Sequence, residues 1–397
     1  MSVTSDYLMK EEMTNTDSST DWETTSPSIL RNTYPFIIKR ESIDEIAVPI
    51  LGYIAPPVAV ITIITNSLVV IVLMKRNMKS PTNCVLIGMA LSDMFTGVIP
   101  MPLYLYFYAA GYYQDYVPNW CCRIYHVFTL YIPTIFHTAS IWLTLTLAIQ
   151  RYIYICHSFR ARTWCTINNV IKGTVAIYFI AILFHLTRFF EYDFESVELM
   201  SLLHRNQTVI GCYILRSQWL VNWIDLYYNV YFWFRVIFVH LIPCTALVVL
   251  NGMLIHAMTL AKRRRKLLIK QNKRNESKKI KDTNCTTLML VAVVFLFLLV
   301  EVPLGILMII TILQNTLKIS IFPDNVIFVT SSIINMMIML SYPLNFFIYC
   351  AMSKQFRNTF KRMFCGGPLP IDRESSQYMT LPTENGRTIV TTDETKL

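Results

Sequence analysis

Acidic and basic side chains lie inside long apolar stretches of this sequence, where a charge is costly unless it is paired or hydrogen-bonded. Asp93 ends the run Ala90-Leu91-Ser92-Asp93, and Glu301 lies in Val300-Glu301-Val302-Pro303. Such residues are functional candidates, as ion sites or as partners for other buried groups. No catalytic cluster accompanies them, and the ten cysteines show no metal-binding spacing. The sequence therefore does not indicate an enzyme.

Glu301 needs a partner at this depth, and three basic side chains in other apolar stretches can supply one. Arg235 and His240 belong to the fifth stretch, and His137 belongs to the third. A structural pair with Arg235 and a direct contact between Glu301 and a ligand are both open alternatives. Glu301 is therefore expected to serve either the core or the ligand pocket.

The elements that position these residues are seven apolar runs, each long enough to cross about 30 Å of hydrocarbon. Composition agrees with a polytopic membrane protein, since 54% of the 397 residues are hydrophobic and only 15% are charged. We predict an all-α seven-transmembrane bundle with spans near residues 48–74, 84–108, 122–149, 169–190, 229–260, 285–313 and 324–350.

Charge in the connecting loops predicts the orientation of the bundle. Lys and Arg gather after the first, third and fifth spans, most densely between residues 262 and 281, whereas the N-terminal tail is acidic. Because basic loops stay on the cytoplasmic side, the N-terminus should be extracellular and the C-terminus cytoplasmic in the plasma membrane. The net charge of +10 reflects this asymmetry, so nucleic-acid binding is disfavoured. A cleaved signal peptide is not expected, because residues 1–28 are polar.

The flanking segments differ in character from the bundle. We expect a disordered extracellular tail over 1–47, the bundle over 48–352, an amphipathic helix on membrane lipid over 353–365 and a disordered cytoplasmic tail over 366–397. Cys365 is either a palmitoylation site or a free cysteine. Thr395 and Leu397 match a short ligand for a PDZ protein, a match that also arises by chance.

Two modifications are predicted on the extracellular side. Cys212, before the fifth span, shares an oxidising compartment with Cys121 and Cys122 at the start of the third. Cys122 is favoured as its disulfide partner, with Cys121 as the alternative, because Cys122 precedes Arg151 by 29 residues, about eight helical turns. Asn206-Gln207-Thr208 is a glycosylation sequon, which places a glycan on Asn206.

The order of the intramembrane polar residues resembles that of rhodopsin-like G-protein-coupled receptors over residues 48–364. Asn66, Asp93, Ser140 and the run Asn345-Phe346-Phe347-Ile348-Tyr349 carry this resemblance. It implies a sodium and water site formed by Asp93, Ser140, Ser341 and Asn345. A protonated Asp93 satisfied by Asn66 and water is the alternative.

The same resemblance assigns an activation switch and a G-protein contact. Ile141, Pro243 and Phe297 match the family's packing switch, and Glu301 replaces the usual tryptophan beside it. Tyr349 is expected to swing inward on activation.

Arg151 and Tyr152 would contact a heterotrimeric G protein. Gln150 stands where the family has an acid that restrains the arginine, so raised basal signalling is expected. Arrestin is a further expected partner.

Longer strings resemble the sex peptide receptor family of invertebrates, also called myoinhibitory peptide receptors. They include His137-Thr138-Ala139-Ser140-Ile141-Trp142, Gln150-Arg151-Tyr152-Ile153-Tyr154 and Ser341-Tyr342-Pro343-Leu344-Asn345-Phe346. This resemblance implies an amidated myoinhibitory-type peptide as ligand and coupling through Gi/o. A receptor for another amidated class, such as FMRFamide-like peptides, and an ion-coupled transporter are the alternatives.

Aromatic and charged residues near the extracellular ends of the spans are the candidates for the ligand pocket. Tyrosine and tryptophan offer stacking and hydrogen bonds to a peptide. An aromatic belt at the membrane interface is the alternative for about half of the aromatic residues at this mouth. The predicted pocket residues are His137, Glu191, Trp219, Trp223, Asp225, Tyr228, Arg235 and Glu301.

Overall fold

The computed structural model describes residues 34–38, 44–204 and 206–364. It contains seven helical segments that are long and apolar enough to cross a membrane, so the predicted seven-helix bundle is confirmed. These spans are Val48–Leu73, Pro81–Ala109, Asn119–Cys156, Ile167–Phe190, Ile224–Lys270, Asn284–Leu317 and Asn325–Met352.

The first three spans and the turns between them are built from consecutive helical elements. In chain order these are α2 (Asp44–Ala47), η1 (Val48–Ile54), α3 (Ala55–Leu73), η2 (Arg76–Met78), α4 (Pro81–Val98), α5 (Met101–Tyr104), η3 (Leu105–Ala109), η4 (Tyr112–Gln114), α6 (Asn119–His126), η5 (Val127–Tyr131) and α7 (Ile132–Cys156).

The remaining spans follow the same plan, with a β-hairpin after the fourth. The elements are α8 (Ser158–Trp164), α9 (Ile167–His185), η6 (Leu186–Phe190), β2 (Tyr192–Met200), β3 (Thr208–Arg216), α10 (Gln218–Val221), α11 (Ile224–Arg235), η7 (Val236–Leu241), α12 (Ile242–Lys270), α13 (Arg274–Leu317), α14 (Asp324–Met352) and α15 (Lys354–Phe364).

Local sequence determines where several of these helices begin. The Ser80 hydroxyl accepts a hydrogen bond from the Asn83 N–H and caps α4, and the Thr166 hydroxyl caps α9 in the same way. Four spans contain a π-helical stretch, namely η1, η3, η5 and η7. Each π-helical turn takes in more residues than an α-helical one and so changes which side chains face the core.

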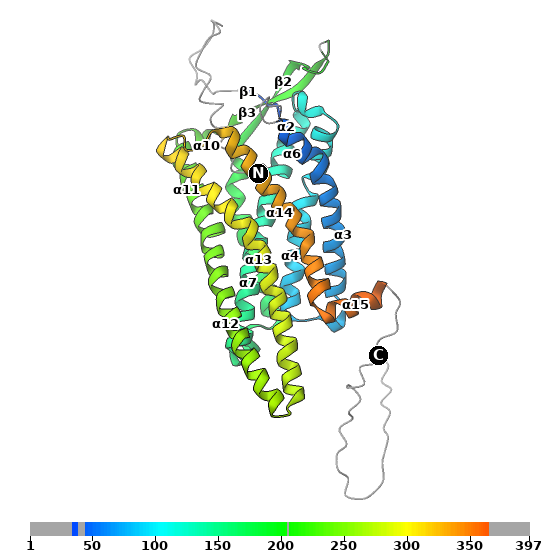
Figure 1. The fold of residues 1–397 in the computed structure, drawn as a ribbon. Coiled ribbons are helices and arrows are strands. Elements are labelled where there is room, and N and C mark those ends of the chain that lie inside the picture. Colours follow the sequence, from blue (N-terminus) through cyan, green and yellow to red (C-terminus); the bar gives the residue numbers. More distant parts are fainter. Residues whose placement is uncertain (1–33, 39–43, 205, 365–397) are drawn as a thin grey trace, which may run out of the picture.

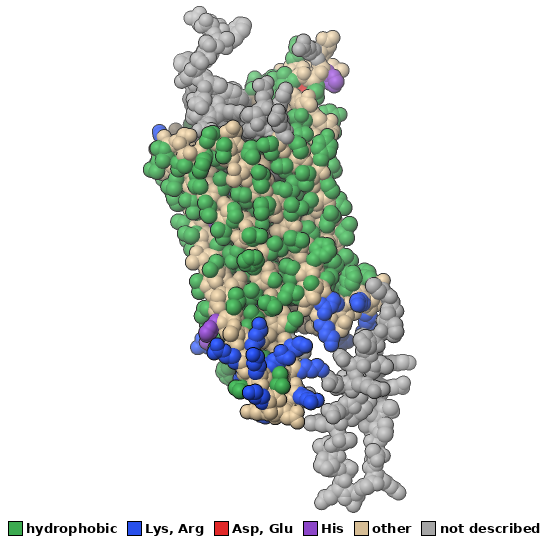
Figure 2. All heavy atoms as spheres, viewed as in Figure 1, with side chains coloured by type: hydrophobic (Ala, Val, Ile, Leu, Met, Phe, Trp, Pro, Cys, Tyr) green, Lys and Arg blue, Asp and Glu red, His purple; other side chains and the backbone are tan. Residues whose placement is uncertain are grey.

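The seven spans run side by side as one bundle, with different structures at its two ends (Figure 1). A small β-sheet covers one end, which we call the sheet end. At the other end a hairpin of α12 and α13 extends outward and α15 lies across the bundle. Lys and Arg side chains gather there, so we call it the basic end, whereas the visible side wall is mostly apolar (Figure 2).

The sheet has three antiparallel strands in the order β1–β3–β2, where β1 is Tyr34–Pro35. In the hairpin, Tyr192 pairs with Arg216 and Met200 pairs with Thr208. Strand β1 pairs Tyr34 with Ile214 on the other edge of β3. The expectation of disorder over 1–47 is therefore wrong for residues 34–38 and 44–47, because backbone pairing and helix formation order them. The rest of that tail lies outside the described residues.

The basic segment after the fifth span is almost entirely helical, whereas the sequence predicts a loop there. Helix α12 continues to Lys270, and α13 begins at Arg274. Its many Lys and Arg residues favour helix once a neighbouring helix packs alongside. The basic charge is therefore carried on a helical hairpin.

Helix α15 agrees with the predicted amphipathic helix and is fixed to the bundle by polar and aromatic contacts. Asn77 donates to the Thr359 hydroxyl at 2.9 Å, and Arg357 donates to the Cys350 carbonyl at 3.0 Å. Phe356 is 1% exposed, and its ring lies 5.9 Å from that of Tyr349 at the end of α14. These contacts join α15 to the basic end.

We predict that Phe356→Ala lowers the thermal unfolding temperature of the purified protein by several degrees. Removing a buried phenylalanine ring costs about 3–5 kcal/mol through lost burial and cavity formation. Phe364→Ala is the matched control, because this residue of the same helix is 48% exposed. Equal unfolding temperatures for the two variants would show that α15 does not stabilise the bundle.

Candidate functional site

A cavity of about 90 Å³, measured as space open to the centre of a water molecule, lies toward the sheet end of the bundle. That volume has room for several waters. Its walls come from five of the seven spans, which is typical of a binding site between helices. The polar lining residues are Thr96, Tyr104, Thr129, Thr134, His137, Arg235, Thr311, Ser331, Asn335 and Tyr342.

Arg235 gives this cavity its charge. It is the last residue of α11, it is 6% exposed, and among the described lining residues it is the only Lys or Arg. A guanidinium carries several fixed N–H donors and suits carbonyl or carboxylate groups. The cavity is therefore fitted to a ligand group that accepts hydrogen bonds.

Glu301 lies next to this cavity, between two histidines. The His137 Nε2 atom is 3.2 Å from Glu301 Oε1, and the His240 Nδ1 atom is 3.3 Å from Oε2. Glu301 is 1% exposed and His240 is 2% exposed. With protons on the facing nitrogens, the imidazoles compensate both carboxylate oxygens. Two of the three partners predicted for Glu301 are thus its observed neighbours, and Arg235 faces the cavity instead.

His137 stands at the junction between this cavity and a second, smaller one. Its Nδ1 atom lies 3.3 Å from the Tyr342 hydroxyl, while its Nε2 atom faces Glu301. His137 and Tyr342 line both the 90 Å³ cavity and an inner cavity of about 20 Å³. The inner cavity has room for about one water or ion. One imidazole therefore contacts the walls of both spaces.

Asp93 lies on the wall of the inner cavity within a set of oxygen and amide groups. Ser140 donates to Asp93 Oδ1 at 2.8 Å, and the Asn345 amide donates to Oδ2 at 3.2 Å. Ser341 lines the same cavity and donates to the Ile338 carbonyl. Asn66, the alternative partner, donates instead to Thr62 of its own helix. A carboxylate with hydroxyl groups beside it offers the oxygen ligands that a small hard cation takes, so Asp93, Ser140 and Ser341 fit a sodium ion, while the Asn345 amide turns its nitrogen toward Asp93.

Two predicted pocket residues, Glu191 and Tyr228, belong to a buried network beside the cavity. Glu191 is fully buried and pairs with Arg188 at 2.8 Å. Tyr227 donates to Glu191 Oε1 at 2.7 Å, and the Tyr228 hydroxyl lies 3.2 Å from that of Tyr192. This network joins the start of the hairpin to α11. We therefore assign Glu191 a structural position, not one on the cavity wall.

The remaining predicted pocket residues lie on the surface. Trp219 is 48% exposed and donates to the Phe190 carbonyl, and Trp223 is 64% exposed. Asp225 is also exposed. Of the eight predicted residues, His137 and Arg235 line the cavity and Glu301 lies directly behind its wall.

Much of the polar lining was missed from the sequence, because uncharged polar residues are ordinary in membrane helices. A periodic signal exists on α14, where Ser331, Asn335 and Tyr342 recur at helical spacing on one face. Thr129 carries no such signal, since it lies in the π-helical stretch η5.

The predicted switch residues lie deeper in the bundle, on three helices that pack together. Ile141 is fully buried and Pro243 is buried near the start of α12. Phe297 packs against the cluster that contains Leu145, Leu247 and Val294.

At the basic end, the arginine of the G-protein motif is held by an aromatic contact. The Arg151 guanidinium lies 5.9 Å from the Tyr154 ring, and the Tyr152 ring lies 5.6 Å from that of His157. Gln150 is 3% exposed, and within the described residues neither of its amide atoms has a hydrogen-bond partner. Tyr349 is buried against Phe356.

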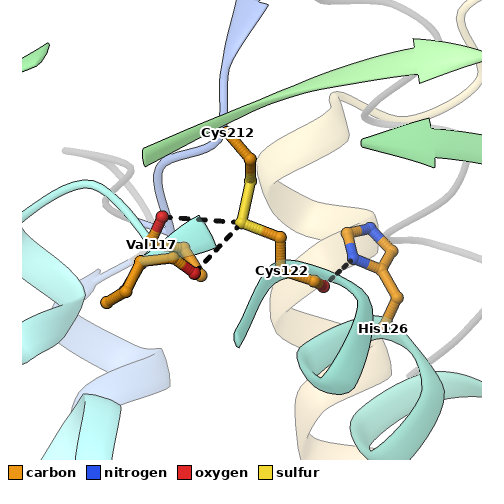
Figure 3. Close-up of a disulfide and its surroundings, with 5 residues drawn as sticks. Val117, Cys122, His126 and Cys212 are labelled. Carbon is orange, nitrogen blue, oxygen red and sulfur yellow. Dashed lines mark hydrogen bonds between the residues drawn. A yellow bond between two sulfur atoms is a disulfide. The ribbon is translucent and has the colours of Figure 1, made fainter. Parts of the chain in front are cut away.

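A disulfide joins Cys122 of α6 to Cys212 of β3, so of the two candidate partners the structure pairs Cys122 (Figure 3). Cys121 is a buried free cysteine. Asn206 is exposed in the turn of the hairpin, where an enzyme can reach it. Cys365, Thr395 and Leu397 lie outside the described residues.

Comparisons with known proteins place this arrangement in a family. The model of the serpentine type seven-transmembrane chemoreceptor family Srw, a family of G-protein-coupled receptors, matches residues 53–367. The sex peptide receptor of Drosophila melanogaster is 43% identical over 89% of this chain and 80% of its own length. The chain belongs to the serpentine family of G-protein-coupled receptors. It is therefore a receptor and not an enzyme, and the rival transporter interpretation is excluded.

Further relatives agree with a receptor for neuropeptides. Sex peptide receptor-related protein 2 of Caenorhabditis elegans is 34% identical over 84% of the receptor and 75% of its own length. The FMRFamide receptor of Drosophila melanogaster is 26% identical over 79% of the receptor and 54% of its own length. The predicted likeness to sex peptide receptors is confirmed, and the receptor is a multi-pass plasma-membrane protein that binds a peptide and a G protein.

We predict that Glu301→Gln reduces surface expression and thermal stability of the receptor. The variant removes the charge that the buried His240 and the partly buried His137 face, and contacts to a charged group contribute about 1.5–3 kcal/mol each. A double-mutant cycle with His240→Asn should show coupling of about 1–3 kcal/mol. Glu198→Gln, at an exposed position on β2, is the control. Normal expression with lost peptide potency would instead indicate that Glu301 contacts the ligand.

Proposed function

We propose that the receptor binds an amidated neuropeptide of the myoinhibitory type, with one end of the peptide in the 90 Å³ cavity, and activates Gi/o. The observation that carries the proposal is Arg235, a buried cation on the wall of a polar cavity that shares His137 and Tyr342 with the inner cavity. A peptide amide or backbone carbonyl accepts hydrogen bonds from a guanidinium. The 43% identity to a sex peptide receptor supports a peptide ligand, and the strings that resemble myoinhibitory peptide receptors support this class.

A receptor for FMRFamide-like peptides is the second candidate. It is supported by the FMRFamide receptor, which is 26% identical over 79% of the chain. Both candidates are amidated peptides, so the same cavity serves either.

The orientation we propose places the sheet end and the N-terminus outside the cell. The disulfide lies at the sheet end, which fits an oxidising compartment. Lys and Arg side chains gather at the opposite end (Figure 2), which fits the cytoplasm. In this orientation Asn206 is accessible for glycosylation, and the bases of α15 and the α12–α13 hairpin face anionic lipid.

The basic end is the proposed surface for cytoplasmic partners. Arg151 and Tyr152 would contact the G protein, and arrestin would compete for the same end. Gln150 is uncharged and cannot restrain Arg151 through an ion pair. The receptor should therefore signal more without ligand than a Gln150→Glu variant does. We also propose that a PDZ protein binds Thr395 and Leu397 and that Cys365 carries a palmitoyl group.

We further propose that a sodium ion binds beside Asp93 in the resting receptor. Asp93 would hold it with the hydroxyls of Ser140 and Ser341 beside the Asn345 amide, and all four residues line the inner cavity. The ion would supply a positive charge that compensates the buried carboxylate.

A dose-response panel of amidated neuropeptides on cells expressing the receptor tests the ligand class. We expect a G-protein response to tryptophan-bearing amidated peptides. Arg235→Gln should weaken their potency by about 10- to 100-fold, the effect of losing one hydrogen bond from a charged group. Trp223→Ala, at a surface position outside the cavity, should leave potency unchanged at equal surface expression.

A strong response to another peptide class, with none to tryptophan-bearing amides, would contradict the ligand assignment. Equal potency at wild-type receptor and Arg235→Gln would contradict the placement of the ligand in this cavity.

A further inference from the structure

His126, near the sheet end of the third span, is enclosed by aromatic rings. The residue is 1% exposed, and its ring lies 4.9 Å from that of Phe36, 5.2 Å from Phe194 and 5.8 Å from Tyr192. Tyr125 and Tyr131 complete the enclosure at 6.1 and 6.5 Å. We call these five rings around His126 the aromatic box.

The histidine inside the box has one ring nitrogen that the chain leaves unsatisfied. Its Nδ1 atom lies 3.2 Å from the Cys122 carbonyl, and the other ring nitrogen points away from that carbonyl (Figure 3). That Nε2 atom is buried and has no hydrogen-bond partner within the described residues. A buried polar atom without a partner is costly and uncommon in folded proteins. The box therefore surrounds a group that can still bind something.

One wall of the box comes from the N-terminal segment and belongs neither to the bundle nor to the β2–β3 hairpin. Phe36 comes from the N-terminal segment 34–38, which runs over the sheet end as an extended strand. The Phe36 N–H donates to the Cys212 carbonyl at 2.9 Å, and its carbonyl accepts from the Val117 N–H at 3.0 Å. Its ring is 8% exposed. Phe36 is thus bound as an extended peptide binds to a sheet edge, by backbone pairing and one buried side chain.

The box adjoins the ligand cavity along the third span. Thr129, Pro133 and His137 line the cavity, and His126 precedes Thr129 by less than one turn. Tyr104, which lines the cavity, belongs to the same hydrophobic cluster as Phe36. A peptide that occupies the cavity and extends outward therefore meets the box next.

We propose that the aromatic box is a second binding subsite of the receptor, for an extended peptide segment that carries an aromatic side chain. Phe36 fills this subsite as an internal ligand. An aromatic residue of the bound peptide displaces Phe36, pairs with the Cys212 and Val117 backbone, and donates a hydrogen bond to His126 Nε2, which accepts because Nδ1–H faces the Cys122 carbonyl. The inference rests on the proposed function, because it supposes a peptide ligand at the sheet end.

Displacement of Phe36 has a measurable consequence for affinity. An internal occupant competes at a high effective concentration, so it reduces the apparent affinity of any ligand for the same place. Removing the Phe36 side chain should therefore strengthen binding, although the substitution deletes a contact from the folded receptor. If Phe36 served only to stabilise the fold, removing its side chain would weaken binding instead.

The test uses N-acetylphenylalaninamide, which carries the ring and the two backbone groups of Phe36. Its binding to purified full-length receptor in lipid nanodiscs is titrated by saturation-transfer NMR. We expect Phe36→Ala to bind this probe about tenfold more tightly than wild type. Ile37→Ala is the matched control, because it truncates the neighbouring side chain and keeps the backbone bridge between Ile37 and Tyr116. It should bind the probe as the wild type does.

Two double variants locate the bound probe. Phe194→Ala and His126→Leu are each combined with Phe36→Ala, so that the test does not depend on one variant folding. If either folded double variant loses the increase in probe affinity seen with Phe36→Ala, the result supports the subsite. Equal binding to wild type and Phe36→Ala, or a gain retained in both double variants, overturns it.

Probe binding needs neither an agonist nor a G protein, so its outcome is separate from that of the proposed function. If no amidated peptide activates the receptor, the proposed function fails while the probe titration still decides whether the box binds an aromatic segment. If peptides activate it, Phe36→Ala should also raise their potency at equal surface expression.

Discussion

The bundle must hold the carboxylate of Glu301 at a depth where water is scarce. Burying one ion costs several kcal/mol even after relaxation, and that cost is offset only by close partners with good geometry. His137 and His240 lie 3.2 and 3.3 Å from the two carboxylate oxygens and supply those partners. The three residues come from α7, η7 and α13, so this contact fixes the relative position of three helices.

The position of His240 depends on a local departure from α-helical geometry. It lies in the π-helical stretch η7, whose wider turn alters which side chains face α13. His137, on the other side, also contacts Tyr342 and lines both cavities. A ligand in the outer cavity and the proposed ion beside Asp93 would therefore act on neighbouring atoms of one polar core. Any ligand that contacts His137 differently in two states of the bundle would shift their populations.

Much of the fold and part of the site could be predicted from the sequence. The length of apolar runs, the charge of loops and acids inside the spans can all be recognised without knowing the packing. The seven spans and the choice of Cys122 over Cys121 follow from such signals. His137 and His240 are two of three candidate partners for Glu301, but the sequence singles out only a pair with Arg235, and the fold places the two histidines there. Three-dimensional packing decided the rest. The sequence predicts that Glu191 faces the ligand at the extracellular mouth, but in the fold it forms an ion pair with Arg188, three residues earlier.

Other features depend on pairing partners far away in sequence. Residues 34–38 take an ordered structure because β3 and Val117 supply backbone hydrogen-bond partners. These partners are distant in sequence, so no local pattern predicts the pairing. The basic residues 262–281 form a helical hairpin because the ends of α12 and α13 belong to two helices that pack against each other. The polar lining of the cavity consists mainly of hydroxyl and amide residues, whose role depends on which helix face they occupy.

We propose that peptide binding at the sheet end is coupled to G-protein binding at the basic end through His137, which contacts both cavities. The most direct test measures peptide affinity of purified receptor in nanodiscs with and without excess nucleotide-free Gi. Coupling free energies between two sites are about 1–3 kcal/mol, so we predict about 5- to 150-fold tighter peptide binding with the G protein. In a folded His137→Phe variant this ratio should fall toward one. An undiminished ratio in that variant, or no effect of Gi on wild type, would contradict the account.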